Sequence, residues 1–388
     1  MNKLVAFLVI IAILVAAIIF LPSIIPNLPW PPTEPGHPVE PGDPGNSGES
    51  SGNGESGNGN PGNSTEPGEP GDSPNRPLAV WVVYWDQQTA MAEARILAES
   101  LEVVSHFSTL FDEYGSLSIP DNTLNMHHEM MTSPLSSEPL HFLTLVNDVV
   151  FADGRPSLLK DRAVMELLLA TPESRAKHIA DIVYLIERYG FDGVELDYET
   201  LHRQPGLAEL FALFCFELWE VLEPQNIALR IVLEPSFPVA RIELPAGPDY
   251  VVMFYNLFGP GTAPGPKADE DFIRRTAQIM QALPGSVTIA FATGGFVWTE
   301  GSTAAQGLTE AQAWELLVSS GAEANRDPGS GALYFSYTGP EGLMHTVWFA
   351  DGETLNHWMD IANDEVGTYR FAIWRLGNNR PESFEILN

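Results

Sequence analysis

The feature that most restricts the fold of this chain is a repeated alternation of short apolar runs with longer helical segments. The apolar runs are rich in β-branched and aromatic residues, which favour strands. They occupy residues 78–85, 102–107, 140–146, 193–198, 227–233, 250–255, 286–292 and 369–374. Helical patterns lie between them, at 89–100, 156–169, 172–189, 206–222, 269–283, 309–319 and 353–362. Eight strands alternating with helices predict parallel pairing and an α/β fold, a closed (β/α)8 TIM barrel.

The connections refine this prediction. The helix at 172–189 has clear ends, because Thr171 is a good N-cap and Gly190 suits the position just past the last turn. Between the seventh and eighth strands, residues 333–337 and 346–349 are expected to form a small hairpin insertion over the barrel mouth. An open, doubly wound sheet is the alternative, but no Gly-x-Gly-x-x-Gly turn follows the first strand.

The N-terminal part of the chain has a different composition. Residues 4–21 form a continuous apolar run preceded by Lys3, and this is about the minimum length of a transmembrane helix. We therefore predict a signal-anchor segment at 1–25, with a cleaved signal peptide as the alternative. Residues 26–77, rich in Pro, Gly, Ser, Asn and Glu, are predicted to be a disordered linker, and 78–388 the barrel. The positive flank should stay cytoplasmic, so the C-terminal domain is expected outside the cell, tethered to the membrane or secreted.

Charge and cysteine content exclude some classes of protein. The chain has 19 Lys and Arg against 51 Asp and Glu, a formal net charge of −32. A nucleic-acid-binding protein needs a basic surface, so that class is excluded. The single cysteine, Cys215, lies in an apolar helical stretch and is expected to be a buried free thiol. We expect a monomer without a cofactor.

Carboxylates alternate with apolar residues in the fourth predicted strand. Glu195, Asp197 and Glu199 fall on one face of that strand, since side chains alternate with a period of two. Neighbouring carboxylates raise each other's pKa, so the cluster is a candidate acid/base site. A polar, solvent-facing edge strand is one alternative. A calcium or magnesium site is another, but no oxygen-rich, glycine-turned ligand loop surrounds the strand, and we expect no metal.

The barrel prediction adds residues to this candidate site, because chemistry in such barrels takes place at the carboxyl ends of the strands. The residues at those ends are Tyr84 and Trp85 in the first strand, Asn147 and Asp148 after the third, Glu234 after the fifth, Tyr255 and Asn256 after the sixth, and Trp374 in the eighth. His106, His127 and His128 show no further pattern of metal ligands and are expected to be core or surface histidines.

The segment 191–199, Phe-Asp-Gly-Val-Glu-Leu-Asp-Tyr-Glu, resembles the signature of glycoside hydrolase family 18, the chitinase family. That signature reads Asp-Gly-x-Asp-x-Asp-x-Glu on the fourth strand of a barrel. Asp192, Gly193, Asp197 and Glu199 match it, whereas Glu195 stands where the family usually has aspartate.

Two further segments are similar to the same family, in the expected order. Residues 253–256, Met-Phe-Tyr-Asn, resemble the family's Met-x-Tyr-Asp, with Asn256 in place of aspartate. Residues 373–377 look like the segment that carries the tryptophan under the sugar. This ending and the run at 345–351 look closest to bacterial members, including spore-cortex and cell-wall N-acetylglucosaminidases.

The resemblance implies a glycosidase that cleaves β-1,4 N-acetylglucosamine-containing glycan, either peptidoglycan or a chitin-like polymer. Glu199 is then the general acid, and the substrate's own 2-acetamido oxygen is the nucleophile. An adjacent carboxylate, Asp197, is expected to raise the pKa of Glu199 and to orient the acetamido group, to which Tyr255 donates. Asp192 and Glu195 would set the charge and orientation of Asp197. Residues expected to contact substrate are Trp374, Asn256, Met253, Asn147, Tyr84 and Glu234.

A non-catalytic glycan-binding or wall-scaffolding protein on the same barrel is the alternative function. The presence of Glu199 favours the enzyme, since members that lose catalysis usually lose this acid. Substitution of the family's aspartates by Glu195 and Asn256 leaves the rate and pH optimum open.

Overall fold

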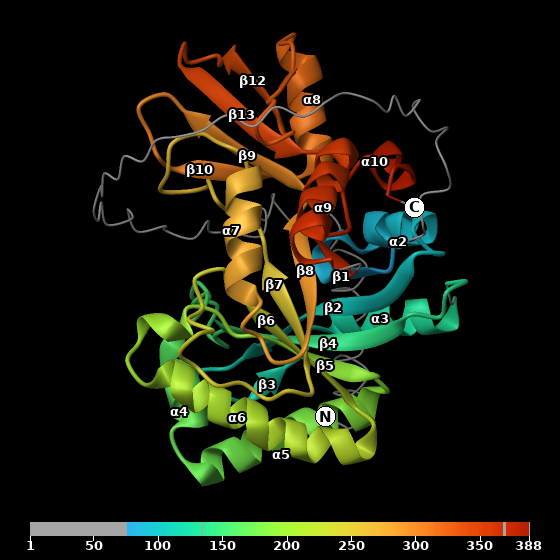
Figure 1. Cartoon of the computed structure of the whole chain (residues 1–388), viewed down its shortest axis with the longest axis vertical. Helices are drawn as coiled ribbons and strands as arrows, with labels where there is room; N and C mark the ends of the chain where they lie inside the picture. The colour runs from blue at the N-terminus through green and yellow to red at the C-terminus, as the bar shows by residue number, and fades with distance from the viewer. Residues whose placement is uncertain (1–75, 134, 368–369, 388) are drawn as a thin grey trace, which may run out of the picture. The chain divides into compact units, whose positions relative to one another are not determined.

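Eight parallel strands form a closed barrel in the computed structural model, which describes residues 76–133, 135–367 and 370–387. The barrel strands are β1 (Leu78–Val83), β2 (Leu101–Phe111), β4 (Leu140–Val149), β5 (Gly193–Asp197), β6 (Ala228–Leu233), β7 (Asp249–Met253), β8 (Ser286–Ala292) and β14 (Phe371–Trp374). They follow one another in chain order, and parallel pairing of β1 with both β2 and β14 closes the circle (Figure 1). The predicted barrel is confirmed, and the open sheet is wrong.

Helices lie around the barrel strands and beside the insertion between the last two of them (Figure 1). They are α2 (Gln87–Ile96), α3 (Asp121–Thr132), α4 (Arg162–Leu169), α5 (Pro172–Tyr189), α6 (Leu207–Leu222), α7 (Glu270–Met280), α8 (Glu310–Ser320), α9 (Gly352–Val366) and α10 (Pro381–Glu385). The predicted ends of α5 are confirmed: the Thr171 side chain accepts from the Ser174 N–H, and Gly190 is left-handed at φ 74°. Helix α3 was not predicted, and in the described chain no helix longer than a turn links β6 to β7.

The insertion between the last two barrel strands is larger than expected. The predicted hairpin is present as β12 (Leu333–Thr338) and β13 (Met344–Ala350), but it belongs to a five-stranded antiparallel sheet. The other strands are β9 (Gly294–Thr299), β10 (Ala305–Leu308) and β11 (Asn325–Arg326). Strand β9 was missed because only Thr293 separates it from β8. The turn depends on Gly294, which has φ 61° and lies where a Cβ would meet the Leu308 carbonyl oxygen at 2.3 Å.

The barrel has an apolar layer outside and a smaller apolar cluster inside. The outer layer packs the strands against the helices. The inner cluster comprises Ala79, Trp81, Val232, Val251, Met253, Ala290 and Ala372. Three aromatic residues from the carboxyl half of the barrel, Phe107, Tyr255 and Trp374, pack on this cluster. The barrel is therefore a filled core whose upper surface is aromatic.

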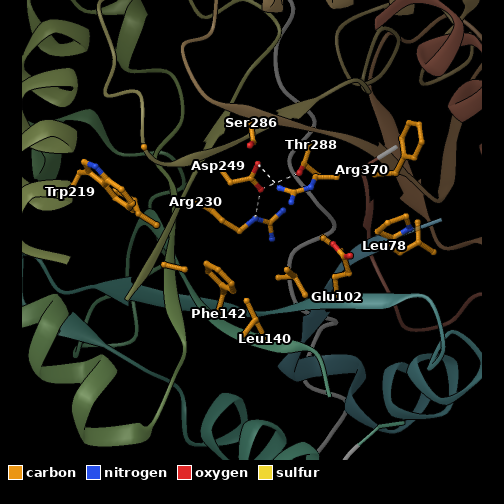
Figure 2. Close-up of a pocket in the computed structure, with 17 residues that line it drawn as sticks. Leu78, Glu102, Leu140, Phe142, Trp219, Arg230, Asp249, Ser286, Thr288 and Arg370 are labelled. Atoms are coloured by element: carbon orange, nitrogen blue, oxygen red, sulfur yellow. Dashed lines mark hydrogen bonds and ion pairs between the residues drawn. The ribbon is translucent and has the colours of Figure 1, made fainter. Parts of the chain in front are cut away.

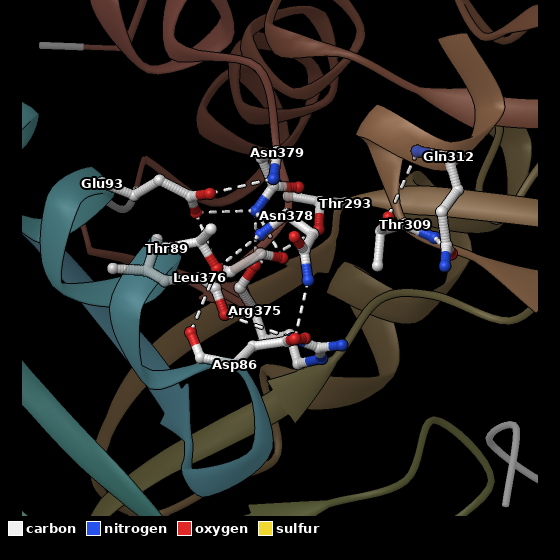
Figure 3. A network of polar contacts seen from close by, with 11 residues as sticks. Asp86, Thr89, Glu93, Thr293, Thr309, Gln312, Arg375, Leu376, Asn378 and Asn379 are labelled. Atoms are coloured by element: carbon white, nitrogen blue, oxygen red, sulfur yellow. Dashed lines mark hydrogen bonds and ion pairs between the residues drawn. The ribbon is translucent and has the colours of Figure 1, made fainter. Parts of the chain in front are cut away.

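A polar network joins the first and last strands at their carboxyl ends (Figure 3). Arg375 Nη1 and Asn378 Nδ2 both bond to the carboxylate of Asp86, each at 2.6 Å. The buried carboxylate of Glu93 accepts from the Gly377 N–H at 2.6 Å and from the Asn379 N–H at 2.9 Å. Burial raises the pKa of Glu93 although these donors oppose the shift. The network fixes the loop after β14, and with it the position of Trp374.

Residues 1–75 lie outside the described part of the chain, and so do the predicted signal-anchor and nearly all of the predicted linker. These assignments and the domain boundaries remain predictions. Among the helices that are described, none is long and apolar enough to cross a membrane. The expected burial of Cys215 as a free thiol is confirmed.

Candidate active site

Strand β5 and the two residues after it place three carboxylates inside the barrel. It pairs with β4 on one side and β6 on the other, so it is a central strand. Its alternate apolar residues face the outer core, whereas Glu195, Asp197 and Glu199 are 0, 9 and 8% exposed. The solvent-facing edge strand is therefore wrong. Buried carboxylates are costly unless they are paired or protonated, so their partners decide what the site can do.

Glu199 is held at both its backbone and its side chain. The Asn147 amide accepts from the Glu199 N–H at 3.0 Å and donates to the Glu199 carbonyl at 3.1 Å. Asn147 is only 1% exposed, and its Nδ2 also donates to the Asp161 carbonyl at 3.3 Å. Sequence reasoning placed Asn147 against the substrate, but these contacts make it a support for Glu199.

A lysine that sequence reasoning did not select lies against the predicted acid. Lys160 Nζ is 2.8 Å from Glu199 Oε1. Burial lowers the pKa of Lys160, but the charges of Glu199, Asp197 and Glu234 outweigh burial and the net shift is upward. Lys160 is on the loop after β4, two residues before α4, so inspection of strand ends could not identify it.

The pKa values of two aspartates near Glu199 are raised. Burial, and then the charge of Glu199, raise the pKa of Asp197 well above its ordinary value, although Lys160 opposes the shift. Asp197 Oδ1 is buried and has no hydrogen-bond partner among the described residues. Burial also raises the pKa of Asp148 to about 6, although the backbone N–H and ammonium of Lys160 oppose it. Both carboxyl groups therefore keep a proton to higher pH than an ordinary aspartate does.

Glu234 supports the loop that follows Glu199. Its Oε2 accepts from the Thr200 N–H at 2.6 Å and lies 3.5 Å from His202 Nδ1. Thr200 has a left-handed backbone, with φ 63°, which is unfavourable for a β-branched residue and requires such support. Glu234, predicted to bind substrate, thus fixes the chain next to the predicted acid.

Glu195 points into the barrel and is fully bonded there. It accepts from Ser105 Oγ at 3.0 Å, from Thr144 Oγ1 at 2.8 Å and from Trp81 Nε1, and it pairs with Arg230 Nη1 at 3.0 Å. Its negative charge is one of the smaller causes of the raised pKa of Asp197. Arg230 was missed, although it is the only charged residue in the otherwise apolar β6.

Asp192 lies at the other end of β5. It immediately precedes the strand, and its Oδ2 accepts from the His141 N–H at 2.8 Å. Five residues of strand span about 16 Å, so the predicted role in orienting Asp197 does not fit this position. Asp192 instead ties the start of β5 to β4.

Aromatic side chains form the floor beneath the carboxylates. Trp374 meets Trp81 and Phe107 edge to face, with ring centroids 5.8 and 4.8 Å apart. Trp85 meets Phe107 in the same way at 5.9 Å. Trp374 is half-buried, and the face of such a ring suits the apolar face of a sugar. Met253, predicted to contact substrate, is 5% exposed and packs below this surface.

The remaining predicted residues lie at the rim of the same end. Tyr255 and Asn256 follow β7 and are half-buried. Asn256 has φ 64°, and its buried Oδ1 has no hydrogen-bond partner among the described residues. Tyr84 begins the short helix η2 (Tyr84–Asp86), where burial and Asp148 raise its pKa. The structure therefore brings Tyr84, Asp148, Asp197, Glu199 and Asn256 to one end of the barrel, beyond the aromatic floor.

The barrel also has a cavity of about 390 Å³, at its opposite end. Its lining includes the first residues of most strands, with Arg230, Asp249, Thr288 and Arg370 (Figure 2). Arg230 Nε lies 3.4 Å from Asp249 Oδ2, which accepts from Thr288 Oγ1 at 3.1 Å. In barrels of this kind, chemistry takes place at the carboxyl ends of the strands, and the amino ends contribute stability. The carboxyl end of the barrel, which holds Asp197 and Glu199, is therefore the candidate active site.

Three buried histidines pack behind the start of β5. His106 Nε2 and His141 Nδ1 are 2.9 Å apart, and the His127 ring stacks on His141 with 12° between the planes. Stacked rings direct their nitrogens into parallel planes, so they cannot converge on one ion. Within residues 76–387, so far as they are described, no group of three or more His, Cys, Asp or Glu side chains is arranged to hold a metal. These histidines serve as core residues.

Comparison with known proteins agrees with the geometry. The family model described as glycosyl hydrolases family 18 matches residues 158–379. YdhD of Bacillus subtilis (strain 168), which carries the name of a sporulation-specific glycosylase, is 25% identical over 228 residues, 55% of this chain and 53% of that protein. The cortical fragment-lytic enzyme of the same organism is 24% identical over 318 residues, 76% of this chain and 69% of that protein. The chain thus spans about half the length of the first of these relatives.

Solved structures share the fold at low sequence identity. The Bacillus cereus spore cortex-lytic enzyme SleL superposes with a TM-score of 0.67 at 17% identity, covering 80% of this chain and 73% of that one. A chitinase from Chromobacterium violaceum gives a TM-score of 0.67 at 16% identity, covering 80% of this chain and 98% of that one. These similarities show that the fold is shared.

Proposed function

The chain belongs to the glycosyl hydrolases of family 18, and from this membership we propose that it is a retaining glycosidase acting on β-1,4 glycan that contains N-acetylglucosamine. The observation that carries the proposal is the placement of Glu199 and Asp197 together at the carboxyl end of β5, above an aromatic floor that includes Trp374. Nothing in the proposal requires a cofactor.

The proposed reaction uses the substrate as its own nucleophile. The 2-acetamido oxygen attacks the anomeric carbon while Glu199 gives its proton to the departing glycosidic oxygen. The attack closes an oxazolinium ion on the sugar. Glu199, now a carboxylate, then takes a proton from the water that opens this ion, and the anomeric configuration is retained. Asp197 stabilises the positive charge, because a carboxylate close to a developing cation lowers its energy in a buried site.

Two side-chain oxygens of the site accept no hydrogen bond from the described residues. Asp197 Oδ1 and Asn256 Oδ1 are buried without partners among the described residues, and a buried acceptor without a donor costs about 1–3 kcal/mol. An acetamido N–H bound to Asp197 and a sugar hydroxyl bound to Asn256 would recover that energy. This complementarity supports an N-acetylated sugar at the position next to Glu199.

For the polymer, we propose bacterial wall glycan with chitin-like glycan as the competing substrate. The names of the two curated relatives refer to sporulation and to cortical fragments, and both are bacterial. The strongly apolar run at 4–21 supports an extracellular, membrane-tethered domain. We treat tethering, location and a monomeric state as parts of the proposal.

The test is release of reducing ends from purified peptidoglycan strands and from chitin oligomers. Glu199→Gln removes the acid while keeping its size, so kcat should fall at least about 10²-fold. Glu187→Gln, at an exposed position on α5, is the matched control and should retain wild-type activity. Oligosaccharide binding without turnover by the wild-type protein over a wide pH range would instead establish a glycan-binding protein.

A further inference from the structure

Lys160 places a positive charge beside Glu199, the predicted general acid, which is unusual because a general acid must carry a proton. Its ammonium is 2.8 Å from Glu199 Oε1, and the two side chains are 24 and 10% exposed. A cation at hydrogen-bond distance favours the ionised carboxylate, and partial burial strengthens the attraction because water screens it less. A general acid, however, acts in its protonated form.

The backbone around Lys160 is built to hold this side chain in place. Lys160 has φ 54°, a left-handed conformation that is unfavourable for a long side chain. Its N–H donates to Asp148 Oδ1 at 2.7 Å, and its carbonyl accepts from Thr200 Oγ1 at 3.4 Å. Thr200 is itself left-handed and is fixed by Glu234. Two strained residues, each held by a carboxylate, therefore meet beside Glu199, and such strain is typical of functional sites.

The charges that face this ion pair come from several elements. They are Asp197 and, deeper, Glu195 on β5, Asp148 on β4 and Glu234 after β6, with His202 and Arg203 on the far side of Glu234, Arg230 beyond Glu195 and Tyr84 beside Asp148. The charges in this set that act on Lys160 are those of Glu199, Asp197 and Glu234, and all three are negative. Several carboxyl groups thus act on its ammonium, and Glu199 Oε1 lies 2.8 Å from Nζ.

We infer that Lys160 is a positioning residue that sets the pH range of the enzyme. Its ammonium holds Glu199 ionised in the free protein, so the proton shared by the neighbouring carboxyl groups resides on Asp197 or Asp148. The inference rests on the proposed role of Glu199 as the acid. Productive binding of glycan must move that proton onto Glu199 and weaken the contact with Lys160. The alkaline limb of kcat/KM, which reports the free enzyme, therefore lies at lower pH than Glu199 alone would give.

The pH dependence of kcat/KM tests the inference with matched lysine variants. Lys160→Met removes the charge while keeping most of the side chain's length. It should move the alkaline limb upward by about one pH unit, which is about a tenfold gain in kcat/KM on that limb. Lys160→Arg keeps the charge and should keep the limb near its wild-type position. Lys177→Met, at an exposed lysine on α5, should leave the whole profile unchanged.

A readout that does not depend on turnover separates this inference from the proposed function. Carbon-13 labelling of glutamate carboxyls, with Glu199→Gln to identify the signal, follows protonation of Glu199 directly. Its midpoint should rise in Lys160→Met and stay near wild type in Lys160→Arg, in protein whose thermal unfolding shows that the fold is intact. An unchanged midpoint, or a loss of kcat/KM that is uniform at all pH values, overturns the inference. If the midpoint rises in Lys160→Met but the wild-type protein hydrolyses no glycan, only the proposed enzymatic function is overturned.

Discussion

The side-chain amide of Asn147 hydrogen-bonds both the N–H and the carbonyl of Glu199, at 3.0 and 3.1 Å. An amide fits a peptide group in this way because it offers one donor and one acceptor in the same plane. The position of the predicted acid therefore depends on a residue of the neighbouring strand. A small displacement of Glu199 matters, because misplacing a catalytic group by about 1 Å can cost about 10²-fold in rate.

Replacing Asn147 by leucine is expected to lower kcat by about 10²-fold with little change in KM. The substitution removes both bonds and leaves two buried backbone groups unsatisfied, so the free energy of unfolding should also fall, by about 1–3 kcal/mol. Steady-state kinetics and urea unfolding measure the two effects. Asn125→Leu, at an exposed position on α3, is the control. Unchanged kcat in Asn147→Leu would show that Glu199 is positioned by other contacts.

Glu195→Gln is expected to destabilise the barrel by about 3 kcal/mol, because it leaves the buried Arg230 with less than its full counter-charge. Asp249, at 3.4 Å from Arg230 Nε, limits the loss. Urea unfolding is the measurement. Glu270→Gln breaks an exposed pair with Arg274 on α7 and should change the free energy of unfolding very little, because water screens such a pair. Equal stability of the two variants would argue that the Glu195–Arg230 pair contributes no more than a surface pair.

His127 is expected to contribute a loss of stability as the pH drops from about 6.5 to about 4. Burial lowers the pKa of His127 from its ordinary 6.5 to about 4, with smaller contributions from His141 and His128. Above 6.5 the ring is neutral in both states; between these values the unfolded chain binds a proton that the folded protein does not. The free energy of unfolding then decreases with falling pH, by at most about 1.4 kcal/mol per pH unit for this histidine.

His127→Phe tests that origin, since the ring already packs on Phe191 with centroids 4.0 Å apart. The variant should lose stability less steeply with acid than the wild type, as measured by urea unfolding at a series of pH values. His357→Phe changes an exposed histidine on α9 and should keep the wild-type slope. If both variants keep that slope, the acid sensitivity comes from other groups, such as His178, whose pKa burial lowers to about 3.

Much of the fold was predictable because its signals are local. The run 286–292 reads as a strand from its own residues and is β8 in the structure. The ends of α5 follow from Thr171 and Gly190, which act within one turn of the chain. Strand β9 was not predictable in the same way, since the apolar pattern continues through Thr293 and only the backbone of Gly294 divides it.

The site was predictable where a motif fixes it and not where tertiary contacts do. Alternation along β5 was enough to place Glu199 and Asp197 on one face. The role of Asn147 depends on the register of β4 against β5, which pairs Val146 with Asp197 and which no local pattern specifies. Lys160 reaches Glu199 from a loop whose course depends on Asp148. Such residues become visible only when the strands are assembled.

The closed circle of strands has a consequence for cutting the chain. The family match begins at residue 158, after β1, β2 and β4 have ended. A fragment that starts there would retain the acid, but β5 would lose its pairing with β4 and β14 its pairing with β1. Both strands would then present unpaired backbone along their whole length, which is a template for intermolecular sheet formation. Shortened versions of this protein are therefore expected to aggregate unless they keep the first three barrel strands.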